Sequence, residues 1–170
     1  GGPGRLPDPA PYPLEIHTHG ASRPVVRVEQ VDLAAPTVQP VPGGGYLLVG
    51  ARARWHGERA EPNAVVLDAN GHHLRSFCIG DGVAHVQVSE AGAIWVGYTD
   101  EGVYGNSGGY RELADRLAVA DLSGGARRAV RIVLPDGSPL PPAAELMARG
   151  SALHTVIGGV WLSLDLDEVT

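Results

Sequence analysis

Residues 86–106 read VQVSEAGAIWVGYTDEGVYGN, and this stretch decides the fold class. Apolar and polar residues alternate up to a tight turn at Glu90, Ala91 and Gly92, and a second apolar strand then runs through Trp95 into a glycine-rich loop. Alternation with a period of two is typical of β-strands, and two strands joined by a short turn form an antiparallel hairpin. The stretch therefore predicts half of a four-stranded antiparallel sheet, within an all-β fold.

A second copy of this hairpin lies upstream, and part of a third lies downstream. The first two copies are offset by 48 positions from Val38 to Val86 and by 47 from Leu48 to Trp95, so that Leu48 and Trp95 are predicted to be equivalent core residues. A period of about 40–50 residues with four strands per unit is typical of β-propeller blades. A β-sandwich or meander, whose short strands also recur regularly, is the alternative. The matching segments are 38–39 with 86–87, 48–50 with 95–97, 65–68 with 118–121, and 94–96 with 160–162.

The chain divides into a lead-in and a repeat region. Residues 1–24 contain six prolines, too many for a helix or a central strand, and they are predicted to form an extended, proline-rich lead-in. Residues 25–170 are predicted to form a partial β-propeller. Its units are expected at about 37–79, 83–134 and, incompletely, 152–170, and helices are expected only at 110–116 and 143–149.

Three local patterns give more detailed expectations. Residues 68–71 (DANG) predict a hairpin turn in which the Asn-Gly pair takes positive φ at both positions. Residues 55–62 read as a charged loop. Alternate residues from Leu74 to Cys78 are predicted to lie in the core, which would make Cys78 a small buried hydrophobe.

Three motifs carry a resemblance to a family. Residues 62–64 (PNA), 75–82 (RSFCIGDG) and 94–106 (IWVGYTDEGVYGN) resemble uncharacterised actinobacterial proteins with propeller-like repeats. The resemblance covers about residues 38–134. It implies a larger propeller of which this chain is a part, and it implies no activity, so no catalytic residues follow from it.

The propeller hypothesis predicts where a site would lie. In each blade, the loop before the innermost strand and the loop between the second and third strands lie on the same face, and such loops carry function more often than strands do. In this chain, that face would collect polar side chains on both sides of the strand pair at 83–98. Residue 55, flanked by Arg54 and His56, is the best candidate for an exposed aromatic. The predicted ligand-binding residues are Asp81, His85, Asp100, Glu101, Tyr104, Asn106 and Trp55.

Metal chemistry is the alternative at this face. Carboxylates from several blades could hold a hard divalent cation, with a nearby histidine as general base. Acidic residues at loop starts, however, commonly bond their own backbone in solvated turns. The pairs His17/His19 and His72/His73 have residue types found in zinc sites, but the first lies in the lead-in and the second follows a turn. We therefore predict no cofactor and no metal ligands, and keep a divalent cation as the alternative.

Composition narrows the choice of partners and of cellular location. The net charge of −6 leaves no basic surplus for a nucleic acid. No apolar run approaches the roughly 20 residues of a membrane span, and no basic-then-apolar leader opens the chain. The single cysteine excludes an intrachain disulfide and fits a cytoplasmic protein. Both ends look like cut ends, so we expect self-association or a missing segment of chain.

Two function classes follow from these patterns. The first is a non-enzymatic binding module that presents a loop-rich face to a protein or a small ligand. The second is a metal-dependent propeller enzyme of lyase or lactonase type, because residues 93–96 followed by Asp100 are similar to the blade motif of virginiamycin B lyase-like and gluconolactonase-like proteins. A divalent cation bound at the propeller axis would separate the two classes.

Overall fold

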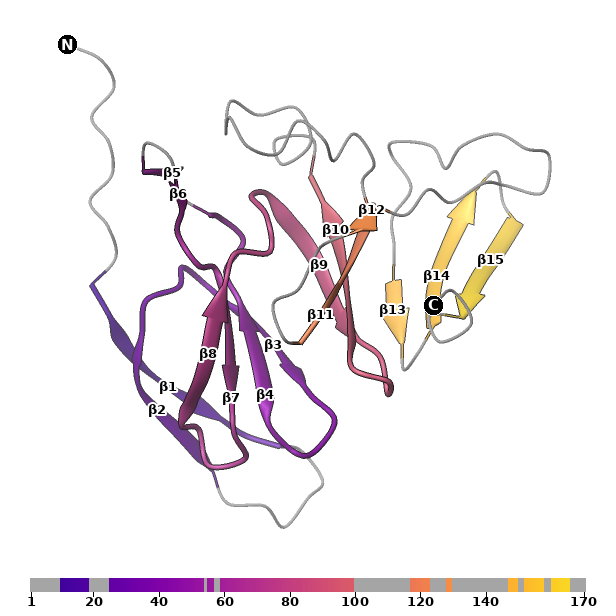
Figure 1. The fold of residues 1–170 in the computed structure, drawn as a ribbon. Coiled ribbons are helices and arrows are strands. Elements are labelled where there is room, and N and C mark those ends of the chain that lie inside the picture. The colour runs from indigo at the N-terminus through magenta and orange to yellow at the C-terminus, as the bar shows by residue number, and fades with distance from the viewer. Residues whose placement is uncertain are drawn as a thin grey trace.

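The computed structural model describes residues 10–18, 25–53, 55–56 and 59–99, together with the segments 117–122, 128–129, 147–149, 152–157 and 160–165 (Figure 1). The regular elements within these residues are all β-strands, and the strand pairs that they form are antiparallel. The predicted all-β fold of antiparallel sheets is therefore confirmed.

Two four-stranded sheets form the centre of the described structure. In both, the strands pair in the order in which they occur along the chain. The first sheet has the order β3-β4-β7-β8 and consists of Thr37–Pro40, Tyr46–Val49, Ala64–Leu67 and His73–Phe77. The second sheet has the order β9-β10-β11-β12 and consists of Val83–Val88, Ala93–Tyr98, Leu117–Asp121 and Arg128–Ala129.

Two smaller sheets flank this pair, so that the sheets follow one another in chain order across Figure 1. The N-terminal hairpin consists of β1 (Tyr12–Ile16) and β2 (Val26–Val31). The third sheet consists of β13 (Met147–Arg149), β14 (Ala152–Ile157) and β15 (Val160–Asp165), in that order. Its last two strands lie within residues 152–170, where the sequence predicts an incomplete third unit.

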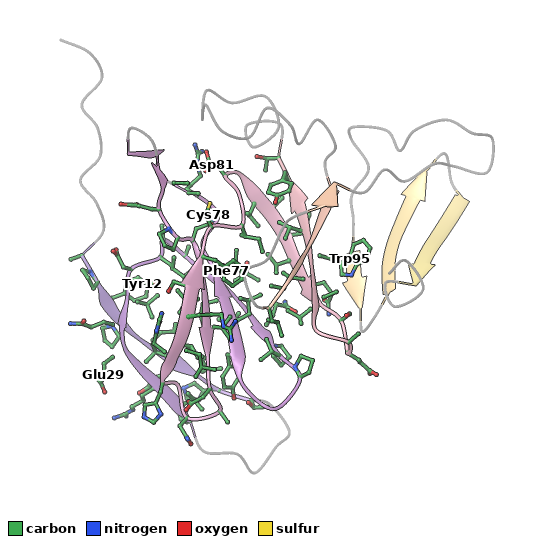
Figure 2. All side chains as sticks on the ribbon, in the orientation of Figure 1. Tyr12, Glu29, Phe77, Cys78, Asp81 and Trp95 are labelled. Carbon is green, nitrogen blue, oxygen red and sulfur yellow. The ribbon has the colours of Figure 1, made fainter. Side chains whose placement is uncertain are left out.

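The N-terminal hairpin covers the first sheet with one apolar face. Val26, Val28 and Val31 are buried in one cluster with Leu48 of β4. The opposite face is charged: Glu15 forms an ion pair of 2.9 Å with Arg27 (N–O distance), and the exposed Glu29 points away from the first sheet (Figure 2). Because one face is apolar and the other charged, the hairpin closes this side of the stack of sheets.

Strand β1 was not anticipated, because it lies in the proline-rich lead-in. Its pairing with β2 is irregular between Tyr12 and Leu14, which places Pro13 at a bulge. Proline lacks an N–H group for the ladder and is tolerated in edge strands and bulges. The tyrosine hydroxyl donates a hydrogen bond of 2.7 Å to the carbonyl of Leu33 and thereby ties the strand to the connection before the first sheet.

The register of the two central sheets corrects the predicted equivalence of Leu48 and Trp95. Val38 pairs with Leu48, and its counterpart Val86 pairs with Val96, so Leu48 corresponds to Val96. By the same offset, Trp95 corresponds to Leu47. A shift of one residue moves a side chain to the other face of a strand, so the predicted pair would lie on opposite faces. The prediction of equivalent core positions is therefore wrong by one residue.

The corrected register shows how the central sheets stack. Leu47 and Val49 of β4 pack with Ile94 and Val96 of β10 in one buried cluster between the two sheets. Trp95 alternates with these residues and points away from the first sheet (Figure 2), with 1% of its surface exposed. The first strands of the two sheets, β3 and β9, lie close to each other across the stack.

The turn between β7 and β8 differs in type from the predicted one. Gly71 donates a hydrogen bond of 3.1 Å to the carbonyl of Asp68, and it is Gly71 alone in this turn that takes positive φ, at 88°. This is a type I turn followed by a left-handed glycine, which introduces a bulge. Because of the register shift between Val66 and Leu67, Leu74 has no paired residue on β7. Its side chain is 57% exposed, so the prediction that Leu74 lies in the core is wrong.

Three further expectations concern the connecting segments. The predicted loop at 55–62 contains a short hairpin, β5 (Trp55–His56) paired with β6 (Arg59–Ala60). The helix expected at 143–149 is wrong over its last three residues, because β13 pairs there with β14, and pairing with a neighbouring strand overrides the helix propensity of Met, Ala and Arg. The helix expected at 110–116 lies outside the described residues.

Candidate functional site

The two kinds of loop that were predicted to share a face do meet at one end of the central sheets. The loop from β4 to β7 lies against the loop from β8 to β9, and the backbone N–H of Val83 donates a hydrogen bond of 2.8 Å to the carbonyl of Ala51. The N–H of Thr99, just after β10, donates one of 2.8 Å to the carbonyl of Gly82. We call this end of the first and second sheets the loop end.

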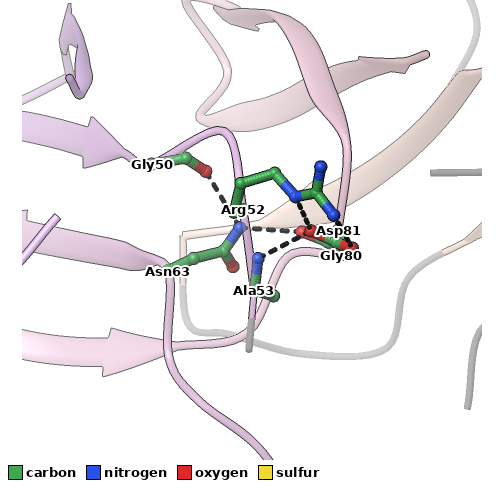
Figure 3. A network of polar contacts seen from close by, with 6 residues as sticks. All are labelled: Gly50, Arg52, Ala53, Asn63, Gly80 and Asp81. Carbon is green, nitrogen blue, oxygen red and sulfur yellow. Dashed lines mark hydrogen bonds and ion pairs between the residues drawn. The ribbon is translucent and has the colours of Figure 1, made fainter. Parts of the chain in front are cut away.

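Asn63 holds the loop end together from the inside (Figure 3). Its side-chain amide nitrogen donates hydrogen bonds to the carbonyls of Gly50, at 3.0 Å, and Gly80, at 2.7 Å. Its side-chain oxygen accepts one from the N–H of Ile79, at 2.9 Å. The side chain is 1% exposed, and in this way one buried residue satisfies backbone groups from both loops.

Asp81 forms a second clamp next to the first (Figure 3). Its Oδ1 accepts hydrogen bonds of 2.9 Å from Nε of Arg52 and of 2.9 Å from the backbone N–H of Ala53. Its Oδ2 accepts a longer one, of 3.3 Å, from Nη2 of the same arginine. The aspartate is 7% exposed, whereas the Arg52 side chain as a whole is 58% exposed. The predicted ligand-binding Asp81 thus serves in this structure to fix the loop end.

His85 is the second predicted residue that the structure describes with its side chain. It is exposed on β9 and pairs with Gly97 of β10. Because glycine has no side chain, the paired residue on β10 does not cover the imidazole of His85. His85 is therefore accessible close to the loop end, and it sits on a strand rather than on a loop.

The other five predicted residues are described in part or not at all. Trp55 lies in β5, opposite Ala60, which places its backbone in the hairpin of the β4–β7 loop. Four more lie outside the described residues, so the structure does not bring them to the site or remove them from it: Asp100, Glu101, Tyr104 and Asn106.

Two of the histidines considered as metal ligands contact neighbouring carboxylates in the structure. Nδ1 of His72 lies 3.1 Å from Oδ2 of Asp68, and His17 lies 3.3 Å from Glu15. In the part of the chain that the structure describes, no three His, Cys, Asp or Glu side chains come together. Cys78 is half-buried, not fully buried as predicted.

Two concave regions lie away from the loop end, and the sequence did not indicate either. A groove of about 390 Å³ lies at the opposite end, between the β3–β4 and β9–β10 turns, and includes Pro42 and Glu90. A pocket of about 220 Å³ lies between β2 and the first sheet. Residues from separate parts of the chain form both regions, so no local pattern could have revealed them.

Comparisons with known proteins add no further constraint. Searches with the chain against protein-family models, curated proteins and solved structures found no match. Within the described residues, the structure contains no helix of the length and apolarity that a membrane crossing requires.

Proposed function

We propose that the chain is a section of a β-propeller that acts as a non-enzymatic binding module and uses its loop end to bind a protein or a small ligand. The family resemblance of residues 38–134 and the repeat of about 48 positions support this proposal. The paired sheets support it too, because propeller blades are four-stranded antiparallel sheets that stack face to face.

The direction of stacking gives further support. Leu47 of the first sheet faces the second sheet, and its counterpart Trp95 faces away from the first sheet, toward the next position in the stack. Equivalent faces therefore point the same way along the chain, as in a series of blades. A sandwich of two sheets would instead bring equivalent inner faces toward each other. The approach of β3 to β9 agrees with innermost strands converging near an axis.

The observation that carries the binding function is the double clamp at the loop end. Asn63 and Asp81 are buried polar residues that bond backbone groups of both loops, and binding surfaces are commonly loops held by a rigid support of this kind. The exposed His85 follows Asp81 by four positions on β9, and the backbone of Trp55 follows Ala53 by two positions in the β5–β6 hairpin. Fixed loops lose less conformational entropy on binding, which favours affinity.

A chemical-shift map tests the proposed binding end. The isotope-labelled chain would be titrated with a set of small amides, amines and carboxylates at millimolar concentration. We expect the perturbed backbone signals to gather at the loop end, around His85 and Thr99. Perturbations that gather instead at the opposite end, around Pro42 and Glu90, would contradict the proposal.

A pair of histidine variants provides the matched control. His85→Ala is expected to weaken binding at the loop end severalfold and to leave the urea midpoint unchanged, because the ring is exposed. His17→Ala removes another exposed ring, directly after β1, and is expected to change neither the binding nor the urea midpoint. If the two variants bind the probes with equal affinity, His85 is not part of the site.

The proposal of a partial propeller includes association of the chain with a second copy or with further blades. The charged outer face of the N-terminal hairpin is unsuited to packing against another sheet, so we expect association at the other end of the stack. Light scattering over a dilution series tests this expectation. A monomer that persists with a cooperative thermal transition would contradict it.

A further inference from the structure

The pocket between β2 and the first sheet has an apolar floor and a polar rim. Its volume is about 220 Å³. The floor includes the almost completely buried side chains of Leu48 and Leu67, together with Val28. A dry cavity of about 150 Å³ can hold a benzene molecule, so this pocket can accommodate one aromatic ring with a short chain.

Close contact between β2 and the β7–β8 turn bounds the pocket at one end. Gly71 lines it, and a Cβ atom built on Gly71 would lie 2.8 Å from the carbonyl oxygen of Arg27 and 2.8 Å from Cγ1 of Val26. The turn therefore lies directly against the hairpin backbone. With φ at 88°, Gly71 also has a conformation that other residues adopt only at a cost.

The bulge in β8 brings two polar side chains to the rim. Residues three apart on a regular strand point to opposite faces. Because the bulge at Leu74 adds one residue, His73 pairs with Leu67 and Ser76 pairs with Val65, and both side chains line the same pocket. Nε2 of His73 lies 2.7 Å from the Ser76 hydroxyl oxygen. Bulges commonly redirect side chains in this way beside functional sites.

The opposite side of the rim is acidic. Asp32 and Gln30 extend from the β2 side, and Asp32 is the charged side chain among the residues that line the pocket. Neither side chain has a hydrogen bond or ion pair with another residue in the described part of the chain. An apolar body capped by an ammonium group would complement this combination of apolar floor and unpaired carboxylate.

The histidine–serine pair at the rim is a binding feature in this structure. A serine nucleophile requires a base that a third group orients. The second ring nitrogen of His73, Nδ1, has no such partner among the described residues, and both side chains are exposed. The pair can still accept or donate a hydrogen bond to the head group of a ligand.

We propose that this pocket binds a small amphiphilic amine, with its apolar body on Leu48 and Leu67 and its ammonium group between Asp32 and the His73–Ser76 pair. The site lies on the side of the first sheet, and it is distinct from the proposed function at the loop end. Either site can exist without the other.

Three probes with the same body and different head groups test the proposal. Phenethylamine, 2-phenylethanol and phenylacetate would each be titrated into the labelled chain while the signals of Leu48, Gly71 and Ser76 are followed. We expect phenethylamine to bind most tightly and phenylacetate least. Asp32→Asn is expected to reduce the preference for the amine over the alcohol by about two- to fivefold, the range of an exposed ion pair.

A pair of phenylalanine variants locates the site. Ser76→Phe is expected to fill the pocket and abolish the shifts, whereas Leu74→Phe adds the same ring on the exposed bulge and is expected to leave them unchanged. If Ser76→Phe does not fold, Asp32→Asn decides alone, because this exposed residue can change without harm to the fold. Absence of pocket shifts with all three probes, or equal binding of phenylacetate and phenethylamine, would overturn the proposal.

Discussion

Removal of the Asn63 side chain is expected to be the most costly polar substitution in the described structure. Asn63→Ala deletes three hydrogen bonds, to the carbonyls of Gly50 and Gly80 and to the N–H of Ile79. These partners are backbone groups at buried positions, so they cannot simply turn toward solvent.

The magnitude follows from these contacts. A buried donor or acceptor that loses its partner costs about 1–3 kcal/mol, and water entering the small cavity recovers part of that amount. For three groups, we expect a loss of about 3–5 kcal/mol in the free energy of unfolding. Typical domains have about 5–15 kcal/mol in total, so this loss would be a large share of the stability of the chain. Asn63→Asp should cost at least as much, because a carboxylate would face two carbonyl oxygens.

Urea denaturation followed by tryptophan fluorescence measures this loss. The control is Asn70→Ala, since this asparagine is exposed in the β7–β8 turn and only its backbone N–H makes a hydrogen bond, to Asp68. We expect the control to stay within about 0.5 kcal/mol of the wild type. A loss below about 1 kcal/mol for Asn63→Ala, with an unchanged m-value, would refute the clamp as a source of stability.

Three further substitutions test other parts of the structure. Gly45→Ala should lower the urea midpoint, because a Cβ at this position would overlap the carbonyl oxygen of Leu67; an unchanged midpoint would show that the backbone can move apart there. Trp95→Ala should lower the free energy of unfolding by about 3–5 kcal/mol. Trp95→Phe should lower it much less, because phenylalanine lacks the buried indole Nε1, which has no hydrogen-bond partner among the described residues. Equal losses for the two variants would contradict this expectation. The pKa of Asp68 lies below its ordinary value of 3.8, mainly because its carboxylate accepts a hydrogen bond from the backbone N–H of His72. This carboxylate therefore stabilises the fold above pH 3.8, and its contribution disappears as the pH falls through the lowered pKa. Urea midpoints of the wild type and Asp68→Asn should therefore converge in acid, and a constant difference would contradict the assignment.

The strand pattern could be predicted from local sequence, because side-chain periodicity and turn residues act over a few positions. The alternation in residues 83–98 and the turn at Gly92 locate β9 and β10 as the structure has them. The repeat also predicts that two four-stranded antiparallel sheets follow one another along the chain. None of these inferences requires knowledge of which residues meet across the fold.

The candidate site could be predicted only in its general position. The sequence places Asp81 at a loop end near His85, and the structure agrees with that position. The sequence does not indicate that Arg52 and Ala53 donate hydrogen bonds to the Asp81 carboxylate, because these partners lie in another loop. Asn63 stands in the motif at residues 62–64, but its role depends on carbonyls that approach only when the two loops meet.

The sequence by itself determined that this chain forms antiparallel β-sheets, since periodicity and turn chemistry are local properties of the chain. Tertiary structure decided the register, which makes Trp95 the counterpart of Leu47 in the other sheet, and it decided that residues 147–149 extend as a strand beside β14. It also decided that Pro13 lies in a paired strand and that Leu74 is exposed. Each of these outcomes depends on hydrogen bonds and packing between segments distant in sequence, and the free energy of those contacts exceeds the preference of any single residue.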